Sequence, residues 1–262
     1  CLYVYQGCDA SILIDSTENK QSEKDAGPNE TVRGYEIIDK AKKILEDACP
    51  STVSCADIIT LATRDAVALA GGPNYTLATG RRDGLVSNAE NVSLPGPRIS
   101  VPAAMKVFAD KGITLNEMVT LLGAHTVGVA HCFFFEDRLS DVSGSSDPPM
   151  DPTLAAKLRK TCAKSQDATA FLDQSTSFEV DNQFYKQILL KKGILQIDQE
   201  LALDNSTSGI VSGFASNRIR FQQSFAKAMR KLGSVEVLVG KDGEIRKNCR
   251  AFNPAPKKQL AF

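Results

Sequence analysis

The sequence predicts a mainly α-helical fold with a few short strands. Three observations point to this class: apolar residues recur at helical spacing, Gly and Pro stand between the periodic segments, and no internal repeat is visible. No linker splits the chain cleanly, so residues 1–262 are expected to form a single domain. The Pro- and Lys-rich tail, residues 254–262, is expected to fray.

The predicted helices can be justified in chain order. Residues 33–48 carry one apolar stripe, and Pro50 follows as a stop signal. A more apolar helix over residues 56–70 is closed by Gly71 and Gly72. Further helices are predicted over residues 102–110, 115–124, 152–162, 181–192 and 210–232, and residues 74–97 are predicted to be a loop.

Composition and charge narrow the possible function classes. The chain is 42% hydrophobic and 24% charged, as is usual for a globular protein. The chain has 31 basic and 31 acidic residues, so non-specific electrostatic binding to nucleic acid or to an anionic membrane is not expected. No apolar run is long enough to span a bilayer.

The seven cysteines are scattered and form no C-x-x-C pair, which argues against a zinc cluster. Long-range disulfides in an oxidising compartment are the better interpretation. Four N-x-S/T sequons, at Asn29, Asn74, Asn91 and Asn205, add to this pattern. Together they predict a secreted glycoprotein.

The chain has two histidines, and His125 has the more informative setting. Thr114 and Glu117 have the spacing of a capping box, which places the start of a helix. His125 then falls on the apolar face at the end of that helix, and Gly123 and Gly128 would let a flat group approach the backbone. From the residues alone a hydrogen-bonded core histidine is the commoner alternative, although His is also the usual proximal ligand of haem iron.

The string G-A-H-T-V-G at residues 123–128 resembles the proximal haem motif of class III, secretory, plant peroxidases. Other blocks of that family occur in the same order: C-D-A-S at 8–11, V-S-C-A-D at 53–57, G-R-R-D at 80–83, L-P-G-P at 94–97, D-Q-E-L at 198–201 and R-K-N-C-R at 246–250. The resemblance runs from about residue 6 to 253 and implies the helical haem-peroxidase fold.

The resemblance assigns roles around a haem b group. His125 matches the axial iron ligand, and Asp198 matches the carboxylate that accepts its hydrogen bond. From the residues alone, a solvated turn is also plausible for Asp198. Asn29 matches the residue that supports the distal histidine and is expected to carry no glycan. Pro95 matches the residue whose carbonyl meets aromatic donors, and Phe134 either lines the access channel or packs in the core.

Two calcium ions are also implied by the resemblance, and oxygen ligands suit them. The proximal site would use side chains and backbone of Thr126, Asp173, Thr176 and Asp181. The distal site would use Gly7, Asp9, Ser11 and Glu23; it is expected to be incomplete, because Leu2 stands where the family has an Asp. For residues 173–181 taken alone, ordinary turn chemistry is the favoured alternative.

Two disulfides follow from the same resemblance, Cys55 with Cys249 and Cys132 with Cys162. The family links the residue matching Cys49 to a cysteine near the N-terminus. The family's distal His would fall at Cys1 and its distal Arg before the chain begins, so both are absent. These departures indicate a domain truncated at its N-terminus.

The resemblance implies a monomeric enzyme that reduces hydrogen peroxide and oxidises small phenolic or aromatic donors. It would be secreted, to the cell wall, the extracellular space or the vacuole. The missing distal pair makes turnover by this chain doubtful, because such acid–base groups contribute about 10²–10⁴-fold. The alternative is a non-enzymatic secreted glycoprotein that binds haem and calcium.

Overall fold

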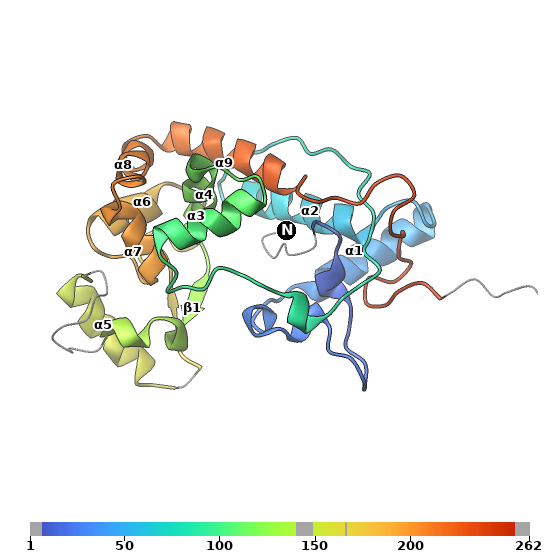
Figure 1. Cartoon of the computed structure of the whole chain (residues 1–262), viewed down its shortest axis with the longest axis horizontal. Coiled ribbons are helices and arrows are strands. Elements are labelled where there is room, and N and C mark those ends of the chain that lie inside the picture. The colour runs from blue at the N-terminus through green and yellow to red at the C-terminus, as the bar shows by residue number, and fades with distance from the viewer. Residues whose placement is uncertain (1–6, 140–148, 166, 255–262) are drawn as a thin grey trace, which may run out of the picture. The chain divides into compact units, whose positions relative to one another are not determined.

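A computed structural model describes residues 7–139, 149–165 and 167–254 (Figure 1). Cys1, Leu2 and residues 255–262 of the expected tail lie outside the described residues. The predicted mainly α fold class is confirmed, because the described residues form α-helices, 3-10 turns and one small two-stranded sheet. Within these residues, no helix is both long and apolar enough to cross a bilayer.

The described residues contain nine α-helices. They are α1 (Tyr35–Ala48), α2 (Cys55–Leu69), α3 (Val101–Asp110), α4 (Leu115–Leu122), α5 (Pro152–Cys162), α6 (Gln183–Leu189), α7 (Gln196–Leu203), α8 (Ser208–Ser216) and α9 (Arg218–Leu232). Two antiparallel strands, β1 (Val129–His131) and β2 (Thr169–Phe171), place Ala130 opposite Ala170. One 3-10 turn, η5 (Gly123–Thr126), directly follows α4.

Local capping explains where several helices begin. The predicted capping box of α4 is confirmed, because the Thr114 hydroxyl accepts from the Glu117 N–H and the Glu117 carboxylate accepts from the Thr114 N–H. At α5 the side chain of Asp151 accepts from the Leu154 N–H, and Pro152 takes the first helical position. Both helices therefore start where the sequence predicts.

Apart from small shifts at helix ends, the predicted and observed helices differ in three places. The single helix predicted over residues 210–232 is wrong, because Asn217 has an extended backbone and separates α8 from α9. Its side chain caps α9 by accepting from the Arg220 N–H at 2.9 Å. The helix predicted over 181–192 shortens to α6, since Asp181 accepts from the Gln183 N–H instead of continuing the helix. The third difference is α7, which was not predicted.

Helix α1 presents its residues differently from the usual amphipathic pattern. Ile37 and Ile44 on the apolar stripe are 65% and 59% exposed, whereas Lys42 is buried. The Lys42 ammonium donates to the Val53 carbonyl at 2.6 Å and pairs with Glu46. Lys42 therefore fastens the loop that follows α1, and it is stabilised because its charge is paired.

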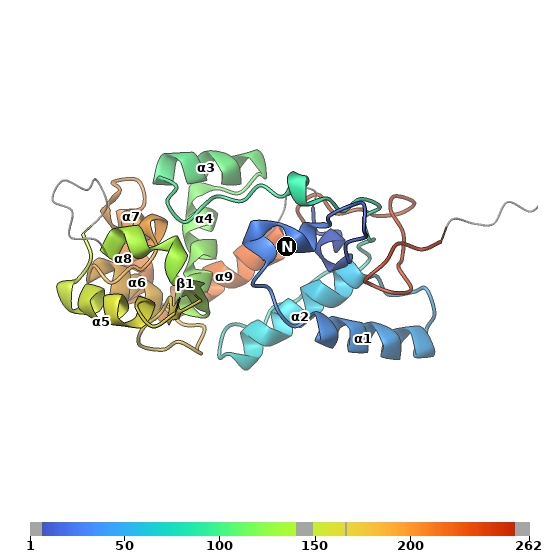
Figure 2. The ribbon, with the colours of Figure 1, turned by 90° about the horizontal axis from the view of Figure 1, so that it is seen from below.

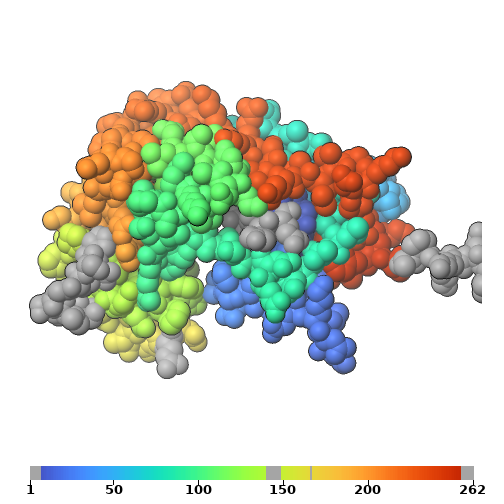
Figure 3. Space-filling model, in the orientation of Figure 1, coloured from blue at the N-terminus to red at the C-terminus, as the bar shows by residue number. Residues whose placement is uncertain are grey.

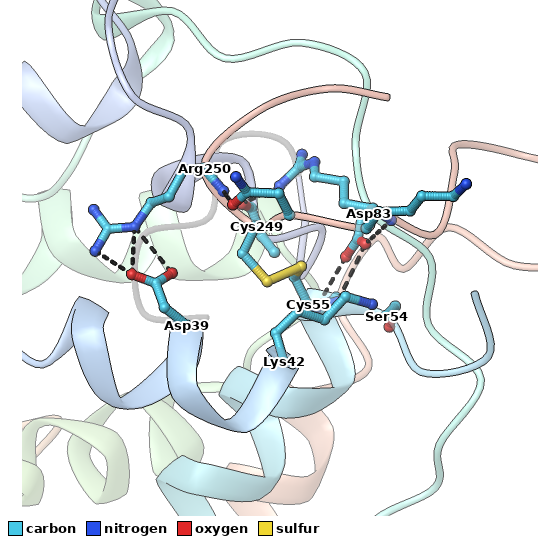
Figure 4. Close-up of a disulfide and its surroundings, with 12 residues drawn as sticks. Asp39, Lys42, Ser54, Cys55, Asp83, Cys249 and Arg250 are labelled. Atoms are coloured by element: carbon cyan, nitrogen blue, oxygen red, sulfur yellow. Dashed lines mark hydrogen bonds and ion pairs between the residues drawn. A yellow bond between two sulfur atoms is a disulfide. The ribbon is translucent and has the colours of Figure 1, made fainter. Parts of the chain in front are cut away.

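The described chain divides into two compact units. Unit 1 comprises the described parts of residues 1–65, 76–94 and 231–262, and unit 2 comprises residues 66–75 and 95–230. The core of unit 1 surrounds the Cys55–Cys249 disulfide (Figure 4) and includes Ala10, Leu13 and Ala56. Nearby, Asp83 accepts N–H bonds from the start of α2, and Arg250 pairs with Asp39 of α1.

In unit 2, α6, α7 and α8 pack against one another (Figures 1 and 2). The green surface of α3 and α4 adjoins the orange surface of α7 and α8 in Figure 3. Aromatic rings fill the centre of this unit, where Tyr185, Phe214 and Phe221 have neighbouring ring centroids 5.2–5.8 Å apart. Such pairs add stability beyond the area they bury.

Candidate active site

His125 lies in η5 and not in the preceding α-helix, which ends at Leu122 instead of Ala124. The 3-10 turn follows α4 without a break, so a capped helix determines the position of the histidine. The imidazole side chain is 29% exposed, and a ligand can therefore reach it. The ring of Phe184 meets the imidazole edge-on, with centroids 6.1 Å apart and planes at 85°.

Asp198 is the partner of this histidine. Its carboxylate Oδ1 lies 2.8 Å from His125 Nδ1, and Asp198 is only 1% exposed on α7. The two residues are 73 positions apart in the sequence. The solvated-turn alternative for Asp198 is wrong, because the residue is buried in a helix that the sequence did not reveal.

The pairing determines which nitrogen of the imidazole is free. An ionised carboxylate can only accept hydrogen bonds, so the neutral imidazole of His125 carries its proton on Nδ1 and keeps a lone pair on Nε2. Desolvation alone would lower the pKa of His125, but the charge and hydrogen bond of Asp198 outweigh it and raise that pKa. The arrangement makes Nε2 a strong ligand for a metal ion.

A cluster of oxygen atoms lies next to His125 in the sequence. The Thr126 hydroxyl is 3.5 Å from an Asp173 oxygen and 3.3 Å from Asp181 Oδ1. The Thr176 hydroxyl is 3.3 Å from Asp173 and 3.2 Å from Asp181, and the Glu179 carbonyl is 3.2 Å from Thr126. Both carboxylates are buried. The cluster thus supplies hard oxygen donors of the kind that Ca²⁺ takes.

The sequence of the chain matches those of known proteins over most of its length. The peroxidase family profile matches residues 1–217. The chain is 58% identical to Peroxidase 44 of Arabidopsis thaliana over 249 residues, which is 95% of this chain and 78% of that protein. It is 57% identical to Peroxidase 57 and 56% identical to Peroxidase 28 of the same plant, covering 95% of this chain and 78% and 79% of theirs.

The chain belongs to the peroxidase family. The predicted resemblance is therefore confirmed, and with it the oxidoreductase class that acts on hydrogen peroxide. The function of a haem peroxidase is supported, and no comparison favours the non-enzymatic alternative. The arrangement of His125 and Asp198 fits the haem that this family implies, because Nδ1 is engaged and Nε2 remains available to iron.

In unit 1 of this peroxidase the residues expected at the distal calcium site come together. The Ser11 hydroxyl lies 2.6 Å from Asp9 Oδ1 and 2.8 Å from Glu23 Oε2, and Gly7 has a positive φ of 98°. Burial raises the pKa of Glu23 to about 7, and the neighbouring charge of Asp9 adds to this effect. Gly7, Asp9, Ser11 and Glu23 line one small pocket.

Of the remaining expected site residues, Asn29 adjoins this cluster, and Pro95 and Phe134 lie on other segments of the chain. Asn29 is buried, its side-chain N–H₂ donates to the Glu23 carbonyl at 2.7 Å, and its Oδ1 has no partner within the described residues. Pro95 is half-buried in the loop before α3. Phe134 is half-buried beside the exposed Phe133, with ring centroids 5.7 Å apart. Cys1, the position that the resemblance matches to the family's distal His, lies outside the described residues.

The cysteines and sequons can be placed as well. The structure contains the disulfides Cys55–Cys249 and Cys132–Cys162, the pairs that the resemblance implied. Among the described cysteines, Cys8 and Cys49 are free thiols. The sequon residues Asn74 and Asn205 are exposed and Asn91 is half-buried.

The sequence did not predict which residues pack against the His125 ring and against the turn that carries it. Gly123 was expected to leave room for a flat ligand, but a Cβ there would lie 2.2 Å from the Tyr185 hydroxyl and 2.8 Å from Phe221. The space beside Gly123 is therefore filled by the protein itself. Phe184 and Tyr185 carry no sequence signal beyond that of ordinary core residues, and their position becomes visible only in the fold.

Proposed function

We propose that this peroxidase holds haem b through Nε2 of His125 and uses it to oxidise small aromatic donors with hydrogen peroxide. The observation that carries the proposal is the 2.8 Å contact between His125 Nδ1 and the buried Asp198 carboxylate. When bound, haem b supplies the iron that is oxidised by peroxide and reduced again by donors in single-electron steps.

The chain's own residues hold and tune this ligand. Asp198 keeps the proton on Nδ1 and orients the ring, and its negative charge makes Nε2 a better electron donor to a cation. Phe184 restricts the tilt of the ring from one side. Pro95 is proposed to offer its carbonyl to the hydroxyl group of a phenolic donor. Asn29 is proposed as a support residue, which agrees with the unpartnered acceptor Oδ1 that it buries.

Replacing Asp198 by asparagine is expected to raise the reduction potential of the reconstituted haem. Asparagine keeps the shape but removes the charge that stabilises the oxidised iron. We expect a positive shift of about 60 mV or more, equivalent to about 1.4 kcal/mol for one electron. Spectroelectrochemical titration measures it. Asp204→Asn is the matched control, since it removes the same charge just beyond the end of α7. Equal potentials for Asp198→Asn and wild type would contradict the assigned role.

We also propose that the cluster of Thr126, Asp173, Thr176 and Asp181 binds Ca²⁺. Two buried carboxylates with hydroxyls and a carbonyl between them would repel each other without a cation. The second cluster, around Asp9 and Ser11, is proposed as an incomplete calcium site that binds more weakly.

Removing calcium is expected to lower the melting temperature of the chain. At a calcium concentration about 100 times Kd, binding contributes about 2.7 kcal/mol, which corresponds to roughly 5–10 °C for a chain of this size. Calorimetry with calcium and with a chelator measures the difference. In the variant Asp173→Asn, most of the calcium-dependent increase in melting temperature should be lost. In Asp9→Asn, little of that increase should be lost. A larger loss in Asp9→Asn than in Asp173→Asn would show that the second cluster is the stronger calcium site.

We propose that the protein is secreted. Two disulfides, one within each unit, favour an oxidising compartment, and exposed sequons at Asn74 and Asn205 are accessible to glycosylation.

A further inference from the structure

The carboxyl end of α4 has an unusual hydrogen-bond pattern. In a regular helix the Val119 carbonyl would accept from the N–H of Gly123, four residues later. Here the Gly123 N–H donates instead to the carbonyls of Thr120 and Leu121. The chain has tightened into the 3-10 turn η5, and the Val119 carbonyl has lost its helical donor.

Tyr185 supplies the missing donor. Its hydroxyl lies 2.9 Å from the Val119 carbonyl and 3.4 Å from that of Thr120. The side chain is fully buried on α6, so these carbonyls take the place of water as its partners. Burial raises the pKa of Tyr185 far above its usual range, and the nearby charge of Asp198 contributes to this, so the hydroxyl stays protonated and remains a donor.

Gly123 makes this contact possible. An added Cβ would lie 2.2 Å from the Tyr185 hydroxyl, which is closer than any real contact. Gly123 has φ −60°, a conformation open to every residue, so its requirement comes from this close approach and not from its backbone. The Tyr185 hydroxyl and Gly123 together therefore terminate α4.

The turn type decides where His125 points. Residues advance by about 120° in a 3-10 helix and by about 100° in an α-helix. Over Gly123, Ala124 and His125 the difference amounts to about 60° around the axis. The imidazole of His125 now points toward Asp198. If α4 continued as a regular helix, the imidazole would point in another direction, away from Asp198. Phe184, next to Tyr185 on α6, meets the imidazole edge in its present orientation.

We infer that Tyr185 is a positioning residue for His125: by capping the Val119 carbonyl it holds residues 123–126 in the 3-10 turn that aims the imidazole at Asp198. The Tyr185 hydroxyl bonds to backbone carbonyls of α4, so it acts on His125 through that backbone. This inference rests on the proposed role of His125, but it concerns the orientation of the ring whether or not haem is bound.

The test compares Tyr185→Phe with Tyr75→Phe, which removes a hydroxyl from another buried tyrosine of unit 2. In the haem-free chain, NMR follows the Nδ1–H signal of His125 and amide exchange at Gly123. We expect about 10-fold faster exchange in Tyr185→Phe alone, the equivalent of one net hydrogen bond, together with a weakened Nδ1–H signal. After haem is added, the electron paramagnetic resonance spectrum of the ferric form should change in Tyr185→Phe only.

The melting temperatures of both variants separate positioning from stability. If Tyr185→Phe keeps the wild-type Nδ1–H signal, exchange rate and ferric spectrum, the inference is overturned whatever its melting temperature, and a lower melting temperature than that of Tyr75→Phe would then give Tyr185 a structural role only. If the wild-type chain takes up no haem, the proposed function fails. The haem-free NMR comparison still tests the positioning role.

Discussion

The variant His125→Ala is expected to lose haem. The Nε2 atom of His125 is the proposed bond to iron, and the paired Asp198 carboxylate would then be left buried without its partner. Loss of a residue that merely supports a metal ligand costs about 10–100-fold in affinity, so loss of the ligand itself should cost more than about 100-fold. Titration of the purified chain with haem, followed at the Soret band, measures the affinity.

His131→Ala is the matched control, because His131 is the second of the two histidines in the chain. His131 lies in β1, opposite Thr169, six residues beyond His125. We expect this variant to bind haem with wild-type affinity. A Soret band that survives in His125→Ala and disappears in His131→Ala would transfer the ligand role to His131.

The second large effect concerns the disulfide Cys55–Cys249. It joins residues 194 positions apart, whereas Cys132–Cys162 spans 30. Closing a loop lowers the conformational entropy of the unfolded chain. For these two lengths this raises the free energy of unfolding by about 5 and about 4 kcal/mol, respectively. Cys55 and Cys249 are also buried in the core of unit 1, between the start of α2 and the segment that carries Arg250 (Figure 4). Removing this bond should therefore destabilise the protein more than removing the other.

Urea unfolding of two double variants measures the difference. Cys55→Ala/Cys249→Ala should lose about 5 kcal/mol, which approaches the whole stability of an ordinary domain. Cys132→Ala/Cys162→Ala should lose about 4 kcal/mol or less. An equal or greater loss in the second variant would contradict the account of which bond stabilises the fold more.

Sequence patterns predicted the helices whose ends are marked by local chemistry. Thr114 and Glu117 cap α4, and Asp151 with Pro152 starts α5, because capping depends on residues three or four positions apart. The break at Asn217 was missed although Asn is a strong capping residue, since the apolar stripe continues across it. Hydrophobic periodicity alone does not reveal a helix cap when the apolar residues continue at helical spacing on both sides of it.

The site was less accessible to pattern reasoning. Helix phase singled out His125, but Asp198 lies 73 residues away in a short helix without a side-chain cap, and only the family resemblance pointed to it. The contact between Tyr185 and Gly123 was not predicted at all. It depends on the approach of α6 to η5, which no local spacing encodes.

The central claim is that His125 is the nitrogen ligand of haem iron in this peroxidase. Paramagnetic resonance of the ferrous nitrosyl complex tests it most directly, using His131→Gln so that His125 is the single histidine. The account predicts a splitting from the nitrogen opposite nitric oxide that changes from triplets to doublets when histidine is labelled with nitrogen-15. A spectrum that does not respond to the labelled histidine would contradict it.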